Sequence, residues 1–167
     1  MWIAILLIIV SIFSRLIPHV PNFSPLIAVA LFSGVYLKGR YSFLIPLAIY
    51  IISDLIIGLH NTIIFTWSSI IFIYFLGYLV KRIKTPVLVI GSTFLSSILF
   101  FVVTNFGVWI MGWYPRTMEG LITCYILAIP FFRTSLLANL IYVSVLFGAY
   151  EFFLRKTKVV VKQALEY

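Results

Sequence analysis

The sequence predicts an all-α integral membrane protein with six transmembrane helices, both termini in the cytoplasm and a short interfacial helix on the outer side before the last span. Two observations lead to this fold class, the composition and the alternation of apolar segments with basic clusters. Of the 167 residues, 63% are hydrophobic and 10% are charged, whereas a soluble domain carries about 25% charged residues. So few charges cannot cover a water-exposed surface, so we expect one membrane domain, residues 1–154, and a basic cytoplasmic tail, residues 155–167.

Six apolar segments are candidates for the spans, since a spanning helix needs about 20 residues. They cover residues 2–17, 26–37, 42–59, 62–80, 86–111 and 134–154. The first segment has neither a basic start nor a cleavage pattern after it, so we interpret it as a retained helix and not as a secretory signal. The second is too short to span alone and is expected to start in the preceding loop or to pack inside the bundle.

Basic residues follow every even-numbered segment. They are Lys38 and Arg40 after the second, Lys81, Arg82 and Lys84 after the fourth, and Arg155, Lys156, Lys158 and Lys162 after the sixth. Because Lys and Arg collect in cytoplasmic loops, these ends are predicted to lie inside, which places the amino terminus inside as well. The net charge of +8 is thus interpreted as a topology signal, and no nucleic-acid partner is expected.

The loops between the other ends are then predicted to be exterior. They cover residues 19–25, 60–61 and 112–133. In the last of them, Thr117 can cap a helix with Glu119 in its first turn, and Pro130 is expected to end or bend that helix. This short helix is expected to lie across the outer mouth of the bundle as a cover.

Polar side chains inside the spans are candidates for function, because each is costly in a bilayer unless it has a partner. Asp54 lies six residues before His60, Asn105 seven before Gly112 and Asn139 six after Arg133, which places each roughly 9 to 10 Å below the outer helix ends at about 1.5 Å per residue. Three polar groups at one depth predict a pocket that opens outward. The alternative is that the amides hold neighbouring helices together and bind no ligand.

Charged and imidazole groups surround this predicted pocket. Arg15 is expected to pair with Asp54 or, like Arg133, to meet an anionic group of a ligand. His19 and His60 with Asp54 could bind a metal, but no metal-binding spacing is present, so we expect no metal and no other cofactor. The serine-rich start of the fifth segment lies at the end opposite both histidines, so a serine nucleophile has no base and no enzyme activity is expected.

Three runs of the sequence resemble a family of functionally uncharacterised bacterial putative transport proteins. The runs are SRLIPHVPNFSPLIAVALFSG at 14–34, SDLIIGLH at 53–60, and TNFGVW with YPRTMEGL within 104–121, and the resemblance spans residues 14–151. That family is similar in turn, in size, helix count and topology, to the substrate-binding S components of energy-coupling factor vitamin transporters. The resemblance implies a multi-pass protein of the bacterial inner (cytoplasmic) membrane. The residues it singles out are Arg15, His19, Pro21, Asn22, Asp54, His60, Asn105, Trp109, Tyr114, Pro115 and Glu119.

The expected function is that of a membrane solute-binding transport component that takes up a vitamin or related small micronutrient from the outer side. The solute would contact the three polar residues and stack on Trp109 or Trp113. An aromatic belt at the membrane surface is the alternative role for Trp67 and Trp113. The alternative function is an accessory or structural subunit of a larger membrane complex, and a lipid-modifying enzyme is less favoured.

The resemblance also implies energising transmembrane and ATPase subunits as partners. S components dock such a subunit through an Ala-x-x-x-Ala pattern in the first helix, but here Ala4 is followed by Ile8 at that spacing. The small residues Ala30 and Gly34 are therefore the expected docking surface, with internal packing as the alternative.

Overall fold

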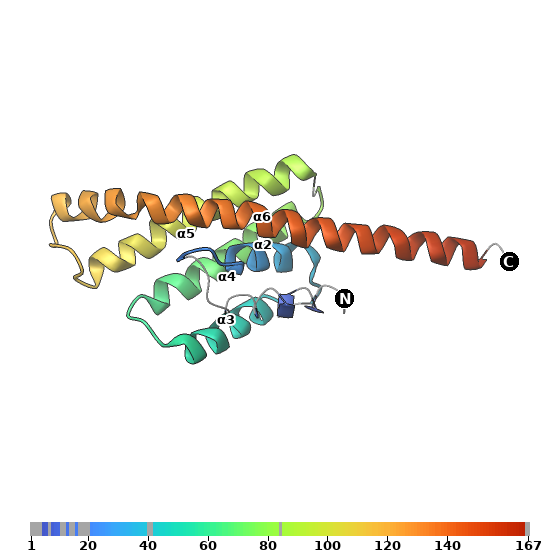
Figure 1. Cartoon of the computed structure of the whole chain (residues 1–167), viewed down its shortest axis with the longest axis horizontal. Coiled ribbons are helices and arrows are strands. Elements are labelled where there is room, and N and C mark those ends of the chain that lie inside the picture. Colours follow the sequence, from blue (N-terminus) through green and yellow to red (C-terminus); the bar gives the residue numbers. More distant parts are fainter. Residues whose placement is uncertain are drawn as a thin grey trace.

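The computed structural model describes residues 5, 6, 8–10, 13, 16, 21–39, 42–83 and 85–165, with side chains to residue 157. Its helices are α2 (Leu26–Tyr36), α3 (Leu44–Ile57), α4 (Ile63–Val80), α5 (Pro86–Ile110) and α6 (Met118–Leu165), as Figure 1 shows. The predicted first span falls largely outside the described residues.

Three of these helices are long and apolar enough to cross a membrane. They are α4, α5 and the part of α6 over Met118–Thr157. Their surfaces carry large exposed apolar side chains, such as Leu79 and Val87 at 73% and 79% exposed, which suits contact with lipid. The all-α, membrane-type fold is thereby confirmed. With 11 and 14 residues, α2 and α3 are shorter than the about 20 residues of a full span, so six spans remain a prediction.

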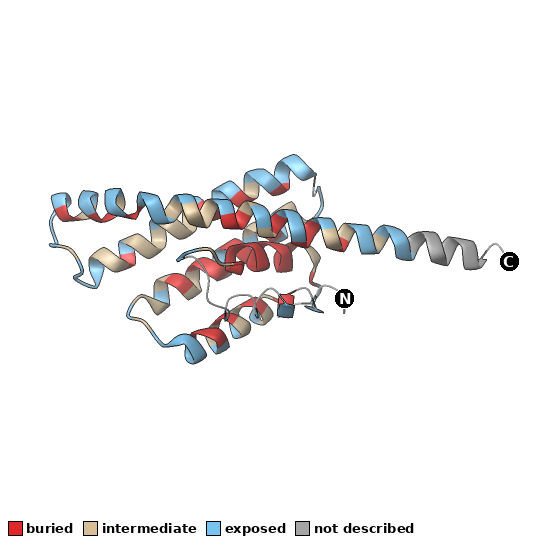
Figure 2. Cartoon of the chain, in the orientation of Figure 1, coloured by how far each residue is buried: buried red, intermediate tan, exposed pale blue. Residues whose placement is uncertain are grey.

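Helix α2 lies inside the bundle. Residues 26–35 are all buried (Figure 2), and the helix packs mainly against α4, with contacts to α3, α5 and α6. A helix enclosed on all sides by protein can be shorter than the bilayer is thick, because neighbouring helices cover both of its ends. Of the two explanations for the short second segment, packing inside the bundle is the correct one.

The contact between α2 and α4 is a crossing of two backbones. A Cβ placed on Gly34 would lie 2.1 Å from the carbonyl oxygen of Tyr74, and one placed on Gly77 would lie 2.2 Å from that of Leu31. Only glycine fits at either position. Since Ala30 is also fully buried, the expected docking surface at Ala30 and Gly34 is wrong, and these residues serve internal packing.

Helix α6 departs most from the prediction. A single helix of 48 residues replaces the interfacial helix and the last span, with Pro130 in its interior. Thr117 does cap its first turn, because the Gly120 N–H donates to Thr117 Oγ1 at 3.1 Å. Proline removes one N–H and frees one carbonyl, whereas ending the helix in apolar surroundings would leave several backbone groups without partners. The helix therefore continues through Pro130.

The first turns of α6 lie along α5 and not across an opening. The Tyr125 hydroxyl donates to the carbonyl oxygen of Val102 at 2.7 Å, and the Cys124 thiol donates to that of Asn105 at 3.5 Å. Figure 1 shows α5 and α6 side by side as a helical hairpin. The predicted cover is thus part of the wall of the bundle.

The turns between the helices lie at two opposite ends of the bundle. Figure 1 places the α3–α4 and α5–α6 turns at one end, which we call the Trp113 end, and the α2–α3 and α4–α5 turns at the other, which we call the Lys81 end. Beyond the Lys81 end, α6 projects past the rest of the bundle.

Candidate functional site

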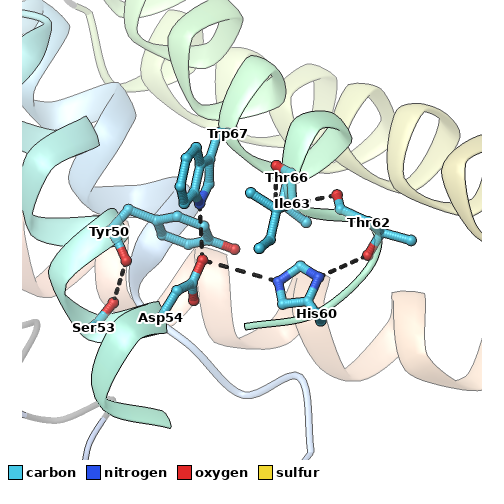
Figure 3. Close-up of polar contacts among 8 residues, drawn as sticks. All are labelled: Tyr50, Ser53, Asp54, His60, Thr62, Ile63, Thr66 and Trp67. Atoms are coloured by element: carbon cyan, nitrogen blue, oxygen red, sulfur yellow. Dashed lines mark hydrogen bonds and ion pairs between the residues drawn. The ribbon is translucent and has the colours of Figure 1, made fainter. Parts of the chain in front are cut away.

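A buried carboxylate marks the Trp113 end. Asp54, in the last turn of α3, is 1% exposed. Its Oδ2 accepts a hydrogen bond from Trp67 Nε1 at 2.9 Å and lies 3.9 Å from His60 Nε2 (Figure 3). His60 is held in turn by Thr62, whose Oγ1 is 2.9 Å from Nδ1. A buried carboxylate is stable only with such partners.

Local sequence explains how these groups meet. Gly58 ends α3 at a φ of 123°, a conformation that glycine adopts without strain. The chain then turns back within a few residues into α4, which brings Trp67 alongside Asp54. The sequence predicted that Asp54 and His60 share a site, and the structure confirms their proximity. It did not predict Trp67 as the hydrogen-bond donor, because that contact depends on the geometry of the turn.

A cavity of about 300 Å³ lies next to this group, between the loop before α2 and the helices α3 to α6; we call it the first cavity. Its polar lining consists of Asn22, Tyr50, Thr66, Ser97, Thr104, Asn105 and Ser135. Tyr50 lies one turn before Asp54 and packs near Trp67 in Figure 3. The volume is at the lower end of the range of small-molecule sites.

Several hydrogen-bond donors of the first cavity are already used by the protein. The hydroxyls of Thr66, Ser97 and Thr104 donate to carbonyl oxygens of their own helices at 2.9, 2.9 and 2.7 Å. Asn105 Nδ2 donates to the carbonyl oxygen of Phe101 at 2.8 Å. These four side chains keep their oxygen lone pairs, and Asn105 keeps a second N–H, so together they present mainly acceptors to the cavity.

Asn139 lies behind the cavity and not in its lining. It is fully buried on α6, and its Nδ2 is 3.0 Å from Ser97 Oγ on α5 and 3.4 Å from Ser135 Oγ. Both serines line the first cavity, so Asn139 fixes wall residues and does not itself meet a ligand. Among the described residues, none donates a hydrogen bond to its Oδ1. The alternative that the amide joins helices therefore describes Asn139.

A second cavity of about 310 Å³ adjoins the first, and Asn105, Val108, Ala128 and Phe131 line both. Four predicted site residues line this second cavity, namely His60, Asn105, Trp113 and Tyr114. Trp113 is 70% exposed, so it stands at the entrance. The two cavities together form a recess at the Trp113 end whose lining combines polar and apolar side chains.

Other predicted site residues lie apart from the recess. Trp109 Nε1 donates to the carbonyl oxygen of Pro115 at 2.9 Å and so closes the α5–α6 turn. Glu119 and Arg133 are exposed on α6 and line neither cavity. The lining of the two cavities does not include these three side chains, so their contact with a solute stays a prediction. The predictions for Arg15, including its pair with Asp54, and for His19 lie outside the described residues.

The family of the chain follows from comparison with known proteins. The model of the Family of unknown function (DUF6580) matches residues 1–163. The chain belongs to DUF6580. No curated protein and no solved structure matches it. What this DUF6580 protein does is therefore argued from its own geometry.

In this DUF6580 chain, the recess offers neutral polar groups and phenyl rings to a ligand. Within the ranges that the structure describes, no three His, Cys, Asp or Glu side chains gather where they could hold a metal ion. Its polar groups are neutral hydroxyls, amides and an imidazole, interleaved with the phenyl rings of Phe100, Phe101, Phe131 and Phe132. Such a surface orients a small solute through hydrogen bonds and flat apolar contacts.

Proposed function

We propose that this DUF6580 protein is a membrane solute-binding transport component that takes up a vitamin or related small micronutrient from the outer side of the bacterial inner membrane. One observation carries the proposal: two adjoining cavities at one end of an apolar bundle are lined with polar side chains from the loop before α2 and from four helices. Polar groups are costly in membrane helices, and a recess that keeps several of them among apolar side chains is typical of a solute site.

The orientation is part of the proposal. The described cations of the α2–α3 turn, the α4–α5 turn and the far part of α6 are Lys38, Lys81, Arg82, Arg155 and Lys156. Since positive charge marks the cytoplasmic side, the Lys81 end faces the cytoplasm. The recess at the Trp113 end then faces outward, where a nutrient arrives. This orientation agrees with six spans and with both termini inside.

The lining narrows the class of solute. Its free oxygen lone pairs favour a ligand with several N–H or O–H donors, because a buried donor needs an acceptor. The phenyl rings favour a flat ligand, and they tolerate a positive charge through cation–π contact. A flat solute that carries amino groups or ring N–H groups fits both requirements.

Energy for uptake is proposed to come from partner subunits. The printed sequence contains no Gly-Lys pair and thus lacks the phosphate-binding loop with which an ATPase holds its nucleotide. An energising transmembrane subunit with an ATPase agrees with the resemblance to S components. Their docking surface is elsewhere than Ala30 and Gly34, since both lie inside the bundle.

The test is a binding experiment on the purified full chain in detergent. Native mass spectrometry against a panel of vitamins and flat nitrogen-containing nutrients is expected to find a ligand. Asn105→Leu, which changes a residue of both cavities, should weaken binding at least tenfold. Thr123→Val is the matched control, because Thr123 is exposed on α6 and its hydroxyl donates to Glu119 O at 2.8 Å.

Two results would overturn the proposal. One is that no member of the panel binds the wild-type protein, and the other is that Asn105→Leu and Thr123→Val bind the ligand equally well. If the wild-type chain instead copurifies with a stoichiometric membrane partner, and Asp54→Asn and Asn105→Leu leave solute uptake by cells unchanged, the chain is an accessory subunit.

A further inference from the structure

A second kind of pocket lies at the Lys81 end. It has a volume of about 520 Å³ and is formed by the α2–α3 turn and the last turns of α4. Lys38 and Lys81 contribute two positive charges to its lining, and Ser42, Tyr74 and Tyr78 contribute hydroxyls. We call it the basic pocket.

Lys81 is held in place before any ligand arrives. Its Nζ donates to the carbonyl oxygen of Leu37 at 2.9 Å and lies 5.5 Å from the centre of the Tyr78 ring. An ammonium group has three N–H donors, so two are left to meet a ligand. Lys38 is exposed on the other side of the pocket.

The charge of the basic pocket is not balanced by acids that line it. Among the described residues that form it, none is Asp or Glu. The contrast is a pocket of about 460 Å³ between α5 and α6, where Arg155 stands beside Glu151. Glu151 accepts a hydrogen bond from the Tyr36 hydroxyl at 2.6 Å. The basic pocket therefore attracts an anion more strongly than the pocket between α5 and α6 does.

The basic pocket is continuous with an apolar surface. Phe43 and Phe75 stack with their ring centres 6.3 Å apart in its wall. On the same part of α4, Phe75 and Leu79 are 48% and 73% exposed. Because Lys81 follows the last residue of a candidate span, the charges lie at headgroup level and the apolar side chains lie at acyl-chain level.

We propose that the basic pocket binds the phosphate of an anionic phospholipid, whose acyl chains lie along α4. The phosphate receives N–H donors from Lys38 and Lys81 as charge-assisted hydrogen bonds. Basic pockets between helices at the membrane surface commonly recognise such headgroups. The site is at the opposite end from the solute recess, and its lining does not include any residue of that recess.

The test measures lipid retention by the full chain in detergent. Delipidated protein is titrated with phosphatidylglycerol or phosphatidylcholine and analysed by native mass spectrometry. Phosphatidylglycerol is expected to bind, and Lys38→Gln should weaken it about fivefold, which corresponds to about 1 kcal/mol of headgroup attraction per lysine. Lys38→Gln with Lys81→Gln should weaken it roughly 25-fold on the same basis.

The control variant removes two charges at the same end but outside the basic pocket. Arg155→Gln with Lys156→Gln should leave the dissociation constant for phosphatidylglycerol within about twofold. Because Lys81 also bonds Leu37, the single change at exposed Lys38 keeps the test valid if the double variant misfolds. Inorganic phosphate is titrated separately, and if it binds the delipidated protein more tightly than phosphatidylglycerol does, the ligand is a free phosphate. Equal binding of phosphatidylcholine, or an equal loss in the control variant, would also overturn the proposal.

Discussion

The hydrogen bond from Trp67 to Asp54 is the interaction whose removal tests the buried site most directly. Trp67→Phe keeps an aromatic ring but deletes the Nε1–H that donates at 2.9 Å to a carboxylate 1% exposed. A hydrogen bond to a charged group contributes about 1.5–3 kcal/mol. At about 2–4 °C per kcal/mol for a chain of this size, the thermal midpoint should fall by about 3–12 °C. Circular dichroism of the full chain in detergent measures it.

The structure offers a matched control in Trp109→Phe. That indole also donates at 2.9 Å, but its acceptor is the neutral carbonyl of Pro115 in an exposed turn. A neutral hydrogen bond contributes about 0.5–1.5 kcal/mol, so the midpoint should fall by no more than about half as much. Equal losses in the two variants would refute the reasoning. The reasoning would also be refuted if Trp67→Phe lowered the thermal midpoint as much in an Asp54→Asn background as in the wild-type protein, because such a double-mutant cycle isolates the interaction of the two side chains.

Three further predictions concern the helices. Gly34→Ala should destabilise the protein by more than about 2 kcal/mol in thermal unfolding, since the added Cβ would lie 2.1 Å from a backbone oxygen. Gly91→Ala is the control. A Cβ added there would have no atom within 4 Å, so the same measurement should show a stabilisation of up to about 1 kcal/mol. Asn139→Leu should change the free energy of unfolding by less than about 1 kcal/mol, because the loss of two hydrogen bonds is offset by removal of a buried Oδ1 that has no donor among the described residues. The same variant should bind the solute more weakly in a titration, because Ser97 and Ser135 lose the amide that holds them. Pro130→Ala should raise the unfolding midpoint without altering helix content, and a fall would mean that the proline ends the helix.

The helix boundaries were predictable because local signals agree with the packing. Gly58 and Gly112, both with positive φ, follow α3 and α5, and Pro86 begins α5 behind Thr85. The predicted limits of the third to fifth segments differ from the observed ones by no more than two residues at any end. In these segments the apolar run ends next to a glycine or proline, which favours a helix boundary at the same place.

Pro130 shows where local signals fail. Proline is a strong sequence signal for a helix end, but Tyr125 and Cys124 tie the same stretch of α6 to α5. That tertiary contact involves residues about 20 positions apart, and no local pattern encodes it.

The candidate site was predictable in its residue types and less so in its partners. The cost of buried polar groups pointed to Asp54, Asn105 and Asn139, and all three lie at or behind the recess. Which of them reaches the cavity depends on the rotation of each helix, which sequence spacing constrains only loosely. Asn105 faces the space, whereas Asn139 faces Ser97.

The enclosure of α2 has a consequence for how the chain is assembled during synthesis. Its 11 residues extend only about 16 Å, roughly half of the hydrocarbon thickness, so lipid alone cannot hold it. Its covering partners α4 and α6 are made later. Helix α2 is therefore expected to reach its enclosed position only after α6 emerges from the ribosome, and a chain shortened before α6 should leave α2 open to added protease.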